Sequence, residues 1–152
     1  MDATFAIRAA EERDLPYIQL ICDEGGLASL TDVADVSVAV GDEGLPVGFI
    51  HIETVTDDTR PAANGAYVYP VAVLGAWQRR GVASALVAHA FEERGGLRLV
   101  ACKPSQGFYP KVGFEPVPWE RIAVRIARDC ELCVAREACG PVPFALSGAG
   151  AR

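Results

Sequence analysis

Short runs in which apolar and polar residues alternate occupy much of the first half of the chain and predict β-strands. In the run 46–55, odd-numbered residues would share one strand face, which puts His51 and Glu53 on the same side. The turn residues Gly41–Gly44 before this run predict a hairpin. Leu15 and Ile18 recur at helical spacing. We therefore expect a helix over Glu11–Cys22 and strands over Thr4–Ala9, Asp35–Val40, Pro46–Val55 and Gly65–Leu74.

The second half contains a longer helical pattern followed by short elements. Apolar residues of Val82–Arg94 recur every three or four positions, and glycines 95 and 96 would end that helix. Strands followed by helix–strand–helix–strand predict a single α/β (α+β) domain with a central mixed, mostly antiparallel sheet flanked by helices. The further elements we expect are strands over Leu97–Cys102, Phe114–Val117 and Val142–Leu146, and helices over Ser105–Val112 and Trp119–Arg128.

Length and composition agree with one folded domain. The chain has 152 residues, of which 51% are hydrophobic and 22% charged, a balance that excludes a disordered chain. The longest uncharged stretch, residues 61–78, contains prolines and glycines and is a poor membrane span. The acidic N-terminus has no long apolar run, so we expect no signal peptide. An odd count of five cysteines favours free thiols in a reducing cytoplasm.

Charge is distributed unevenly along the chain. The formal net charge is −6; residues 1–70 hold thirteen acids and three bases, whereas residues 71–111 hold six bases and two acids. An acidic protein repels nucleic acid, so we expect no nucleic-acid partner. The basic middle segment could still hold a small polyanion, although scattered solvated charge would give the same counts.

The segment Gln78–Ala83 combines the features of an anion-binding loop. It opens the helix predicted over Val82–Arg94, where free backbone N–H groups and the positive end of the helix dipole gather. Gly81 permits close approach of a ligand to the backbone, and Arg79 and Arg80 add charged donors suited to phosphate. The segment matches neither a Walker P-loop nor a Gly-x-Gly-x-x-Gly dinucleotide loop.

Two motifs in the same order and register resemble the GCN5-related N-acetyltransferase (GNAT) superfamily. The first is Val71-Ala72-Val73 followed by Gln78-Arg79-Arg80-Gly81-Val82-Ala83, and the second is Phe108-Tyr109-Pro110-Lys111-Val112-Gly113-Phe114. The resemblance implies one GNAT domain over residues 1–152, in which a splayed strand pair binds acetyl-CoA and no metal is expected. The pantetheine arm would pair with the strand 71–73, and the pyrophosphate would lie on the amides of residues 79–84. The cofactor-binding residues implied in this way are Val71, Ala72, Val73, Gln78, Arg79, Arg80, Gly81, Val82, Ala83 and Ser84.

The resemblance also implies roles in catalysis. A neutral amine would attack the thioester, and a backbone N–H near Val73 would stabilise the resulting oxyanion. Tyr109 matches the family's tyrosine that protonates the leaving thiolate; the alternative is an aromatic residue that only packs. The family's glutamate base has no counterpart within residues 66–70. Glu53 and His51 on the preceding strand are therefore the candidates for the base, the alternative being polar residues without a catalytic role.

Three cysteines follow the second motif in a Cys-x2-Cys-x5-Cys pattern made of Cys130, Cys133 and Cys139. The two-residue spacing is typical of metal ligands, but a zinc site requires a fourth ligand. Cys22, Cys102 or a carboxylate would serve only if the fold brings it close. We therefore favour free thiols over a metal site.

The sequence thus predicts a cytoplasmic, acetyl-CoA-dependent N-acetyltransferase that acts on a primary amine of a small molecule or amino acid. The acidic residues 1–70 favour a cationic or zwitterionic acceptor, and we expect no membrane partner. The alternatives are a protein N-terminal or lysine acetyltransferase, and a non-catalytic acyl-CoA-binding regulatory module. The identity of the acceptor and of the base stays open, as does the formation of a homodimer.

Overall fold

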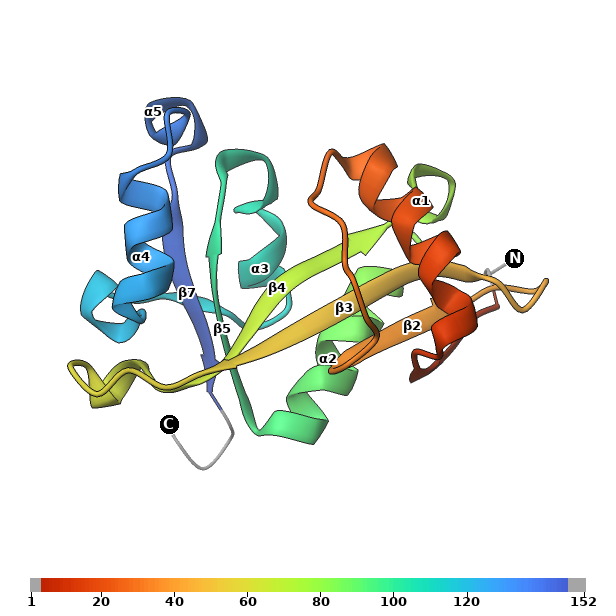
Figure 1. The fold of residues 1–152 in the computed structure, drawn as a ribbon, viewed down its shortest axis with the longest axis horizontal. Coiled ribbons are helices and arrows are strands. Elements are labelled where there is room, and N and C mark those ends of the chain that lie inside the picture. The colour runs from red at the N-terminus through yellow and green to blue at the C-terminus, as the bar shows by residue number, and fades with distance from the viewer. Residues whose placement is uncertain (1–3, 148–152) are drawn as a thin grey trace. The chain divides into compact units, whose positions relative to one another are not determined.

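Seven strands of the computed structural model are hydrogen-bonded in the order β1-β2-β3-β4-β5-β7-β6 (Figure 1). The structure describes residues 4–147. The pairs β1–β2, β2–β3, β5–β7 and β6–β7 are antiparallel, and β4–β5 is parallel. The strands are β1 (Ala6–Ala9), β2 (Val36–Val40), β3 (Pro46–Val55), β4 (Gly65–Val73), β5 (Gly96–Ala101), β6 (Glu115–Pro116) and β7 (Val142–Ser147).

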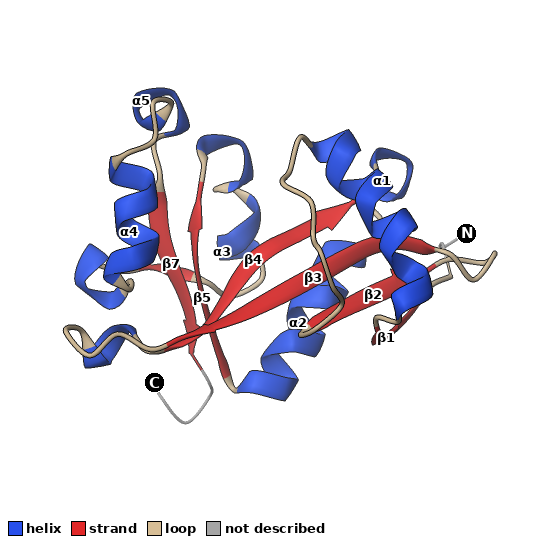
Figure 2. Cartoon of the chain, in the orientation of Figure 1, coloured by secondary structure: helices blue, strands red, loops and turns tan. Residues whose placement is uncertain are grey.

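Within residues 4–147, five α-helices accompany this sheet (Figure 2). Their presence beside a mixed sheet confirms the predicted fold class. The parallel pairing of β4 with β5 includes Tyr67 opposite Arg98, and the splay expected further along β4 stays a prediction. The helices are α1 (Leu15–Gly25), α2 (Val82–Arg94), α3 (Phe108–Lys111), α4 (Val124–Glu131) and α5 (Arg136–Cys139).

The chain divides into two compact units. Unit 1 comprises residues 1–52 and 69–92, and unit 2 comprises residues 53–68 and 93–152. In unit 1, the register of β2 with β3 puts Val38 opposite Phe49. Both side chains are fully buried and belong to one cluster with Ile18 and Cys22 of α1. Helix α1 therefore covers the face of β3 that carries Phe49.

Helix α2 lies against the opposite face of β3 in unit 1. Successive strand residues point to opposite faces, so Gly48 faces away from the side that Phe49 occupies. A Cβ atom on Gly48 would lie 3.1 Å from the Ala72 carbonyl oxygen and 3.1 Å from Val82 Cγ1. Glycine at this position therefore allows β4 and the start of α2 to approach β3 closely, which positions the loop between them.

Two helices also cover opposite faces of the strands in unit 2. Leu99 and Val100 of β5 point to opposite faces. Phe144 of β7 lies opposite Leu99 and contacts the Tyr109 ring of α3. On the other face, Val100 packs against a buried cluster that contains Tyr67 and the buried side of α4. The core of unit 2 therefore has an α3 side and an α4 side.

The helix predicted over Trp119–Arg128 is divided in the structure. A 3₁₀ turn covers Trp119–Arg121, and α4 begins only at Val124. Ile122 and Ala123 between them are 0% and 1% exposed, and the Ala123 N–H donates to the Tyr67 hydroxyl at 2.9 Å. This hydrogen bond to a distant residue holds Ala123 outside the helix and sets the start of α4.

Other predicted elements differ mainly at their ends. Helix α2 has the predicted bounds, and the hairpin turn is confirmed by a 2.9 Å hydrogen bond from the Gly44 N–H to the Gly41 carbonyl oxygen. The helix predicted over residues 105–112 is shorter, and α5 was not predicted. Within residues 4–147, none of the helices has the length and apolar character needed to cross a membrane.

Candidate functional site

The loop predicted to bind an anion leads directly into α2 in unit 1. Its backbone has positive φ angles at Arg79 (64°) and Gly81 (83°), and left-handed non-glycine residues cluster at ligand sites. The Ala85 N–H donates to the Gly81 carbonyl oxygen at 3.0 Å, whereas the N–H groups before it have no intrahelical acceptor. Apart from its chain neighbours, no described heavy atom lies within 4 Å of a Cβ built on Gly81. The space beside this turn is therefore open to a ligand.

Two exposed arginines add positive charge to this loop. The Arg80 guanidinium lies 5.1 Å from the centre of the Trp77 ring, a favourable cation–π distance. Neither Arg79 nor Arg80 has a carboxylate partner among the residues that the structure describes. The Gln78 side-chain amide donates to the Val73 carbonyl oxygen at 3.1 Å and ties the loop to β4. The loop thus combines open N–H donors with unpaired cations, as a phosphate group requires.

His51 of β3 is tied to the β4 backbone just before the predicted pantetheine strand. Its Nδ1 lies 2.7 Å from the Tyr69 carbonyl oxygen. Because a carbonyl oxygen only accepts, Nδ1 carries the proton in the neutral imidazole and Nε2 keeps a lone pair. Pro70, the residue after Tyr69, follows a cis peptide bond and has no N–H group to donate to a neighbouring strand. The His51 ring is therefore held against the β4 backbone, two residues before Val71.

Glu53, the other candidate base, is paired with a cation in unit 2. Its Oε2 lies 2.5 Å from Nη2 of Arg125 in α4, and its side chain is 31% exposed. The Arg125 guanidinium thus occupies one oxygen of the carboxylate with a charge-assisted hydrogen bond. The sequence did not reveal this ion pair, because 72 residues separate the two partners. The role of Glu53 as base stays a prediction.

Tyr109, the predicted acid, lies in α3 of unit 2 among aromatic rings. Its ring centre is 5.3 Å from that of Phe114 and 6.0 Å from that of Phe144. Burial raises the pKa of the Tyr109 hydroxyl, which therefore stays protonated at neutral pH. No described residue accepts a hydrogen bond from it. The hydroxyl can thus donate a proton, and its placement at the thioester stays a prediction, since the anion-binding loop belongs to unit 1.

Sequence reasoning missed a carboxylate that lies just beyond the end of β4. Glu24, in the last turn of α1, accepts a hydrogen bond from the Gly75 N–H through Oε1. The preceding Leu74 N–H donates to the Val47 carbonyl oxygen at 2.9 Å, which fixes this part of unit 1 against β3. The only signal in the sequence was the excess of acids in residues 1–70, which does not single out one position.

A profile of the acetyltransferase (GNAT) domain matches residues 33–116. The chain belongs to this family. The match covers more than half of the chain and includes β2 to β5, the anion-binding loop and α3, which confirms the resemblance seen in the two motifs. Among curated proteins, no sequence matches the chain.

Solved structures share this GNAT fold. An N-acetylglutamate synthase from Neisseria gonorrhoeae, in complex with coenzyme A and N-acetyl-glutamate, is 17% identical with a TM-score of 0.74; the match covers 96% of this chain and 35% of that one. A Mycobacterium tuberculosis protein in complex with CoA and NLQ is 16% identical with a TM-score of 0.68, covering 93% and 98%. An Arabidopsis thaliana protein in complex with the bisubstrate analogue CoA-Ac-MVNAL is 15% identical with a TM-score of 0.67, covering 94% and 98%. The chain thus spans about a third of the length of the first of these proteins.

The anion-binding loop fits the pyrophosphate of acetyl-CoA, the co-substrate of the family. Its open helix start, the free space at Gly81 and the unpaired Arg79 and Arg80 are the features that a diphosphate needs. Val82, the first residue of α2, is 1% exposed, so this end of the helix is anchored in the core. The N–H donors are therefore held in place before a ligand arrives.

The cysteine prediction requires a correction. Cys102 after β5 and Cys139 in α5 form a disulfide, with their Cα atoms 4.8 Å apart across a sequence separation of 37. The prediction of free thiols is wrong for this pair, because unit 2 brings together two segments that sequence spacing does not connect. Cys22, Cys130 and Cys133 are free. Within residues 4–147, no group of three or more His, Cys, Asp or Glu side chains could hold a metal ion.

Proposed function

We propose that this GNAT domain, over residues 1–152, transfers the acetyl group of acetyl-CoA to the primary amine of a small molecule or amino acid. The observation that carries the proposal is the loop of residues 78–84, which opens α2 with exposed donors and unpaired arginines. The diphosphate of acetyl-CoA would accept hydrogen bonds from these donors. The amides of the pantetheine arm would pair with the backbone of Val71–Val73.

The transfer begins when the neutral amine attacks the carbonyl carbon of the thioester. A C–N bond forms, and the carbonyl oxygen becomes an oxyanion that a backbone N–H near Val73 stabilises. The C–S bond then breaks as the carbonyl re-forms, and the nitrogen gives up a proton to a base. Tyr109 protonates the leaving thiolate, so the products are an N-acetyl amine and free coenzyme A.

His51 is the base that the hydrogen bonds favour over Glu53. With Nδ1 bonded to the Tyr69 carbonyl oxygen, Nε2 of His51 carries the lone pair of the neutral imidazole, whereas the carboxylate of Glu53 pairs with Arg125. The rate should rise with pH because only the neutral amine attacks. We expect His51→Ala to change the alkaline-rising limb of kcat/KM and Glu53→Gln to leave it unchanged. If both variants keep the wild-type profile, water and backbone groups serve as the base.

The charges of residues 1–70 favour a cationic or zwitterionic acceptor. Glu24 lies beside the end of β4, and residues 1–70 hold thirteen acids against three bases. Such a surface attracts ammonium groups and repels polyanions. The alternative acceptor is a protein N-terminus or lysine, which receives support from the Arabidopsis thaliana neighbour and its bisubstrate analogue CoA-Ac-MVNAL.

Thermal unfolding with acetyl-CoA tests the binding loop. At a hundredfold excess over Kd, acetyl-CoA should stabilise the wild-type chain by about 2.7 kcal/mol. Gly81→Glu, which puts a carboxylate beside the predicted diphosphate, should remove this gain. Gly44→Glu is the matched control, because Gly44 also has a positive φ (77°) with no non-neighbouring described atom near its Cβ position. The loop assignment is wrong if Gly81→Glu responds to acetyl-CoA as Gly44→Glu does.

Release of free thiol from acetyl-CoA tests the reaction itself. The panel would contain amino acids, diamines and short peptides with free N-termini or lysines. We expect turnover with small amines to exceed turnover with peptides, and the reverse order would favour the protein-acetylating alternative. Thermal stabilisation without turnover on any amine would favour the non-catalytic acyl-CoA-binding module.

We also propose that the chain works in the cytoplasm, as a monomer or homodimer, without nucleic-acid or membrane partners. The acidic composition supports the absence of nucleic-acid partners. The Cys102–Cys139 disulfide counts against a reducing compartment such as the cytoplasm. If the compartment is reducing, acid quenching of the cells followed by alkylation in denaturant should label all five cysteines. Labelling of only Cys22, Cys130 and Cys133, the free cysteines of the structure, would argue for an oxidising location.

A further inference from the structure

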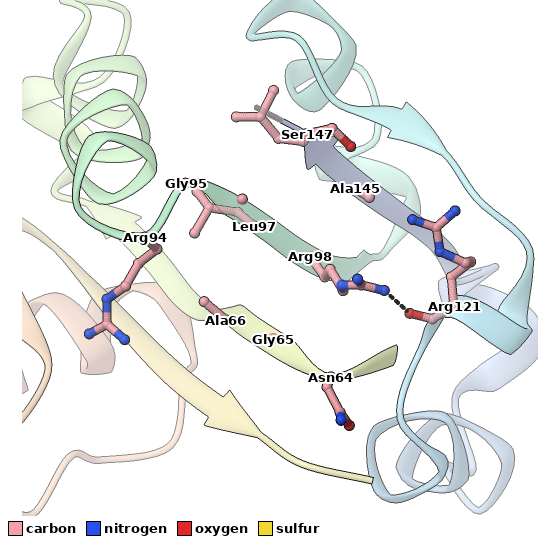
Figure 3. A pocket seen from close by; sticks show the side chains of 12 residues that line it. Asn64, Gly65, Ala66, Arg94, Gly95, Leu97, Arg98, Arg121, Ala145 and Ser147 are labelled. Atoms are coloured by element: carbon pink, nitrogen blue, oxygen red, sulfur yellow. Dashed lines mark hydrogen bonds between the residues drawn. The ribbon is translucent and has the colours of Figure 1, made fainter. Parts of the chain in front are cut away.

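A cavity of about 350 Å³ lies in unit 2 where β4 and β5 begin and β7 ends (Figure 3). Its volume is at the lower end of the range for small-molecule sites. The lining includes the glycines Gly65, Gly95 and Gly96, so backbone is accessible on two sides. None of the lining residues belongs to the acetyl-CoA loop, and Tyr109 and Glu53 do not line it.

The charged residues of the described lining are three arginines from separate segments. Arg94 ends α2, Arg98 lies in β5, and Arg121 ends the 3₁₀ turn before α4 (Figure 3). The described lining contains no Asp or Glu. Arg98 and Arg121 have no carboxylate partner among residues 4–147. A concave surface that carries one sign of charge concentrates small ions of the opposite sign.

The Arg98 guanidinium is held in one orientation. Its Nη1 donates to the carbonyl oxygens of Ala62 at 2.5 Å and Arg121 at 2.7 Å. These bonds use one end of the guanidinium and leave Nε and Nη2 as donors along one edge. A Cβ on Gly65 would lie 3.5 Å from this Nε, so glycine keeps the approach to the edge open. Such an edge binds two oxygens of a carboxylate or phosphate group in parallel.

The surroundings of Arg98 disfavour an uncompensated positive charge. Burial lowers the pKa of the Arg98 guanidinium; Tyr67 partly opposes this effect, and the like charge of Arg121 adds to it. A half-buried cation next to a second cation is stabilised when an anion binds between or beside them. The cavity therefore has the charge, the donors and the space for a small anion.

We propose that this cavity binds a small oxyanion, namely the phosphate or carboxylate group of a metabolite, through Arg98 and Arg121. Arg94 also lines the cavity, and its guanidinium donates to Thr54 Oγ1 at 3.2 Å. The site lies entirely in unit 2 and does not depend on acetyl-CoA binding. It would give the domain a second ligand besides its acetyl donor.

Amide NMR spectra of the ¹⁵N-labelled full-length chain test this proposal. Inorganic phosphate is added at constant ionic strength, with sodium chloride as the reference salt and succinate in a parallel titration. We expect saturable shifts of the Gly65, Gly95 and Gly96 amides with phosphate, succinate or both, and the more tightly bound anion identifies the chemistry. The Gly81 amide separately reports any anion bound at the acetyl-CoA loop.

Two matched arginine variants complete the experiment. Arg121→Gln should weaken the binding reported by the cavity glycines by about tenfold or more, because it removes a charge-assisted hydrogen bond. Arg128→Gln changes the same charge at an exposed position of α4 outside the cavity and should keep wild-type affinity. The proposal is overturned if the cavity glycines do not shift, or if they respond equally in both variants. Neither outcome depends on the result of the acetyl-CoA test.

Discussion

Removing the hydroxyl of Tyr67 should destabilise unit 2 through two buried backbone groups. The Tyr67 side chain donates to the Ala63 carbonyl oxygen at 2.7 Å and accepts from the Ala123 N–H at 2.9 Å. Ala63 is 0% exposed and Ala123 is 1% exposed, so water does not readily replace the hydroxyl. Tyr67→Phe keeps the ring in the core and leaves both backbone groups without this partner.

The structure also bounds the size of the effect. A buried donor or acceptor that loses its partner costs about 1–3 kcal/mol, so two groups give about 2–6 kcal/mol. The Val124 N–H at the start of α4 is held by Asp57 Oδ2 at 2.8 Å, which restrains the helix start from turning toward water. The structure around the Ala63 carbonyl can partly relax in the variant, which should bring the loss of stability below the upper end of this range. We expect a loss of about 2–4 kcal/mol, or a Tm lower by roughly 5–15 °C.

Urea unfolding of both proteins measures this loss. The slope m should stay unchanged, because the two folded states bury the same surface. Tyr17→Phe is the control: Tyr17 has no hydrogen bond to a described side chain through its hydroxyl, and its loss should stay within about 0.5 kcal/mol. A loss below about 1 kcal/mol in Tyr67→Phe at constant m would refute the assignment of these two hydrogen bonds as a stabilising link.

Three further predictions concern the acid, an ion pair and the disulfide. Tyr109→Phe should keep acetyl-CoA affinity and lower kcat roughly 10- to 10⁴-fold; a kcat within a factor of about two would assign Tyr109 to packing. Hydrogen bonds of 2.7 and 3.0 Å from Arg8 lower the pKa of Asp14 in the folded chain. The folding stability that these bonds add is therefore fully present above the unfolded pKa of about 3.9, and it is lost as the pH falls through the lower folded pKa. Asp14→Asn should accordingly flatten the acid limb of stability against pH, and an unchanged limb would contradict the pairing. Reducing the Cys102–Cys139 disulfide should lower the free energy of unfolding of the wild-type chain by up to about 4 kcal/mol. Reductant should leave the stability of Cys102→Ser unchanged, and an equal effect of reductant on both proteins would show that the two cysteines are thiols.

Elements whose chemistry is local could be predicted from the sequence. The apolar stripe and the following glycine pair defined α2 over Val82–Arg94, and the structure has the same bounds. The turn that ends at Gly44 and the loop of Gln78–Ala83 before the helix were also found. In each case the deciding hydrogen bonds and backbone angles involve residues a few positions apart. The two motifs that surround Gly81 and Tyr109 were sufficient to identify the GNAT family.

Features that join distant residues were decided only by the tertiary structure. The hydroxyl of Tyr67 sets the start of α4, Cys102 meets Cys139, and Glu53 pairs with Arg125. The three cavity arginines likewise come from a helix end, a strand and a turn. A hydrogen bond, a disulfide or an ion pair requires groups within a few ångströms. Strand order and helix packing create that proximity, and the spacing of residues along the chain carries no record of it.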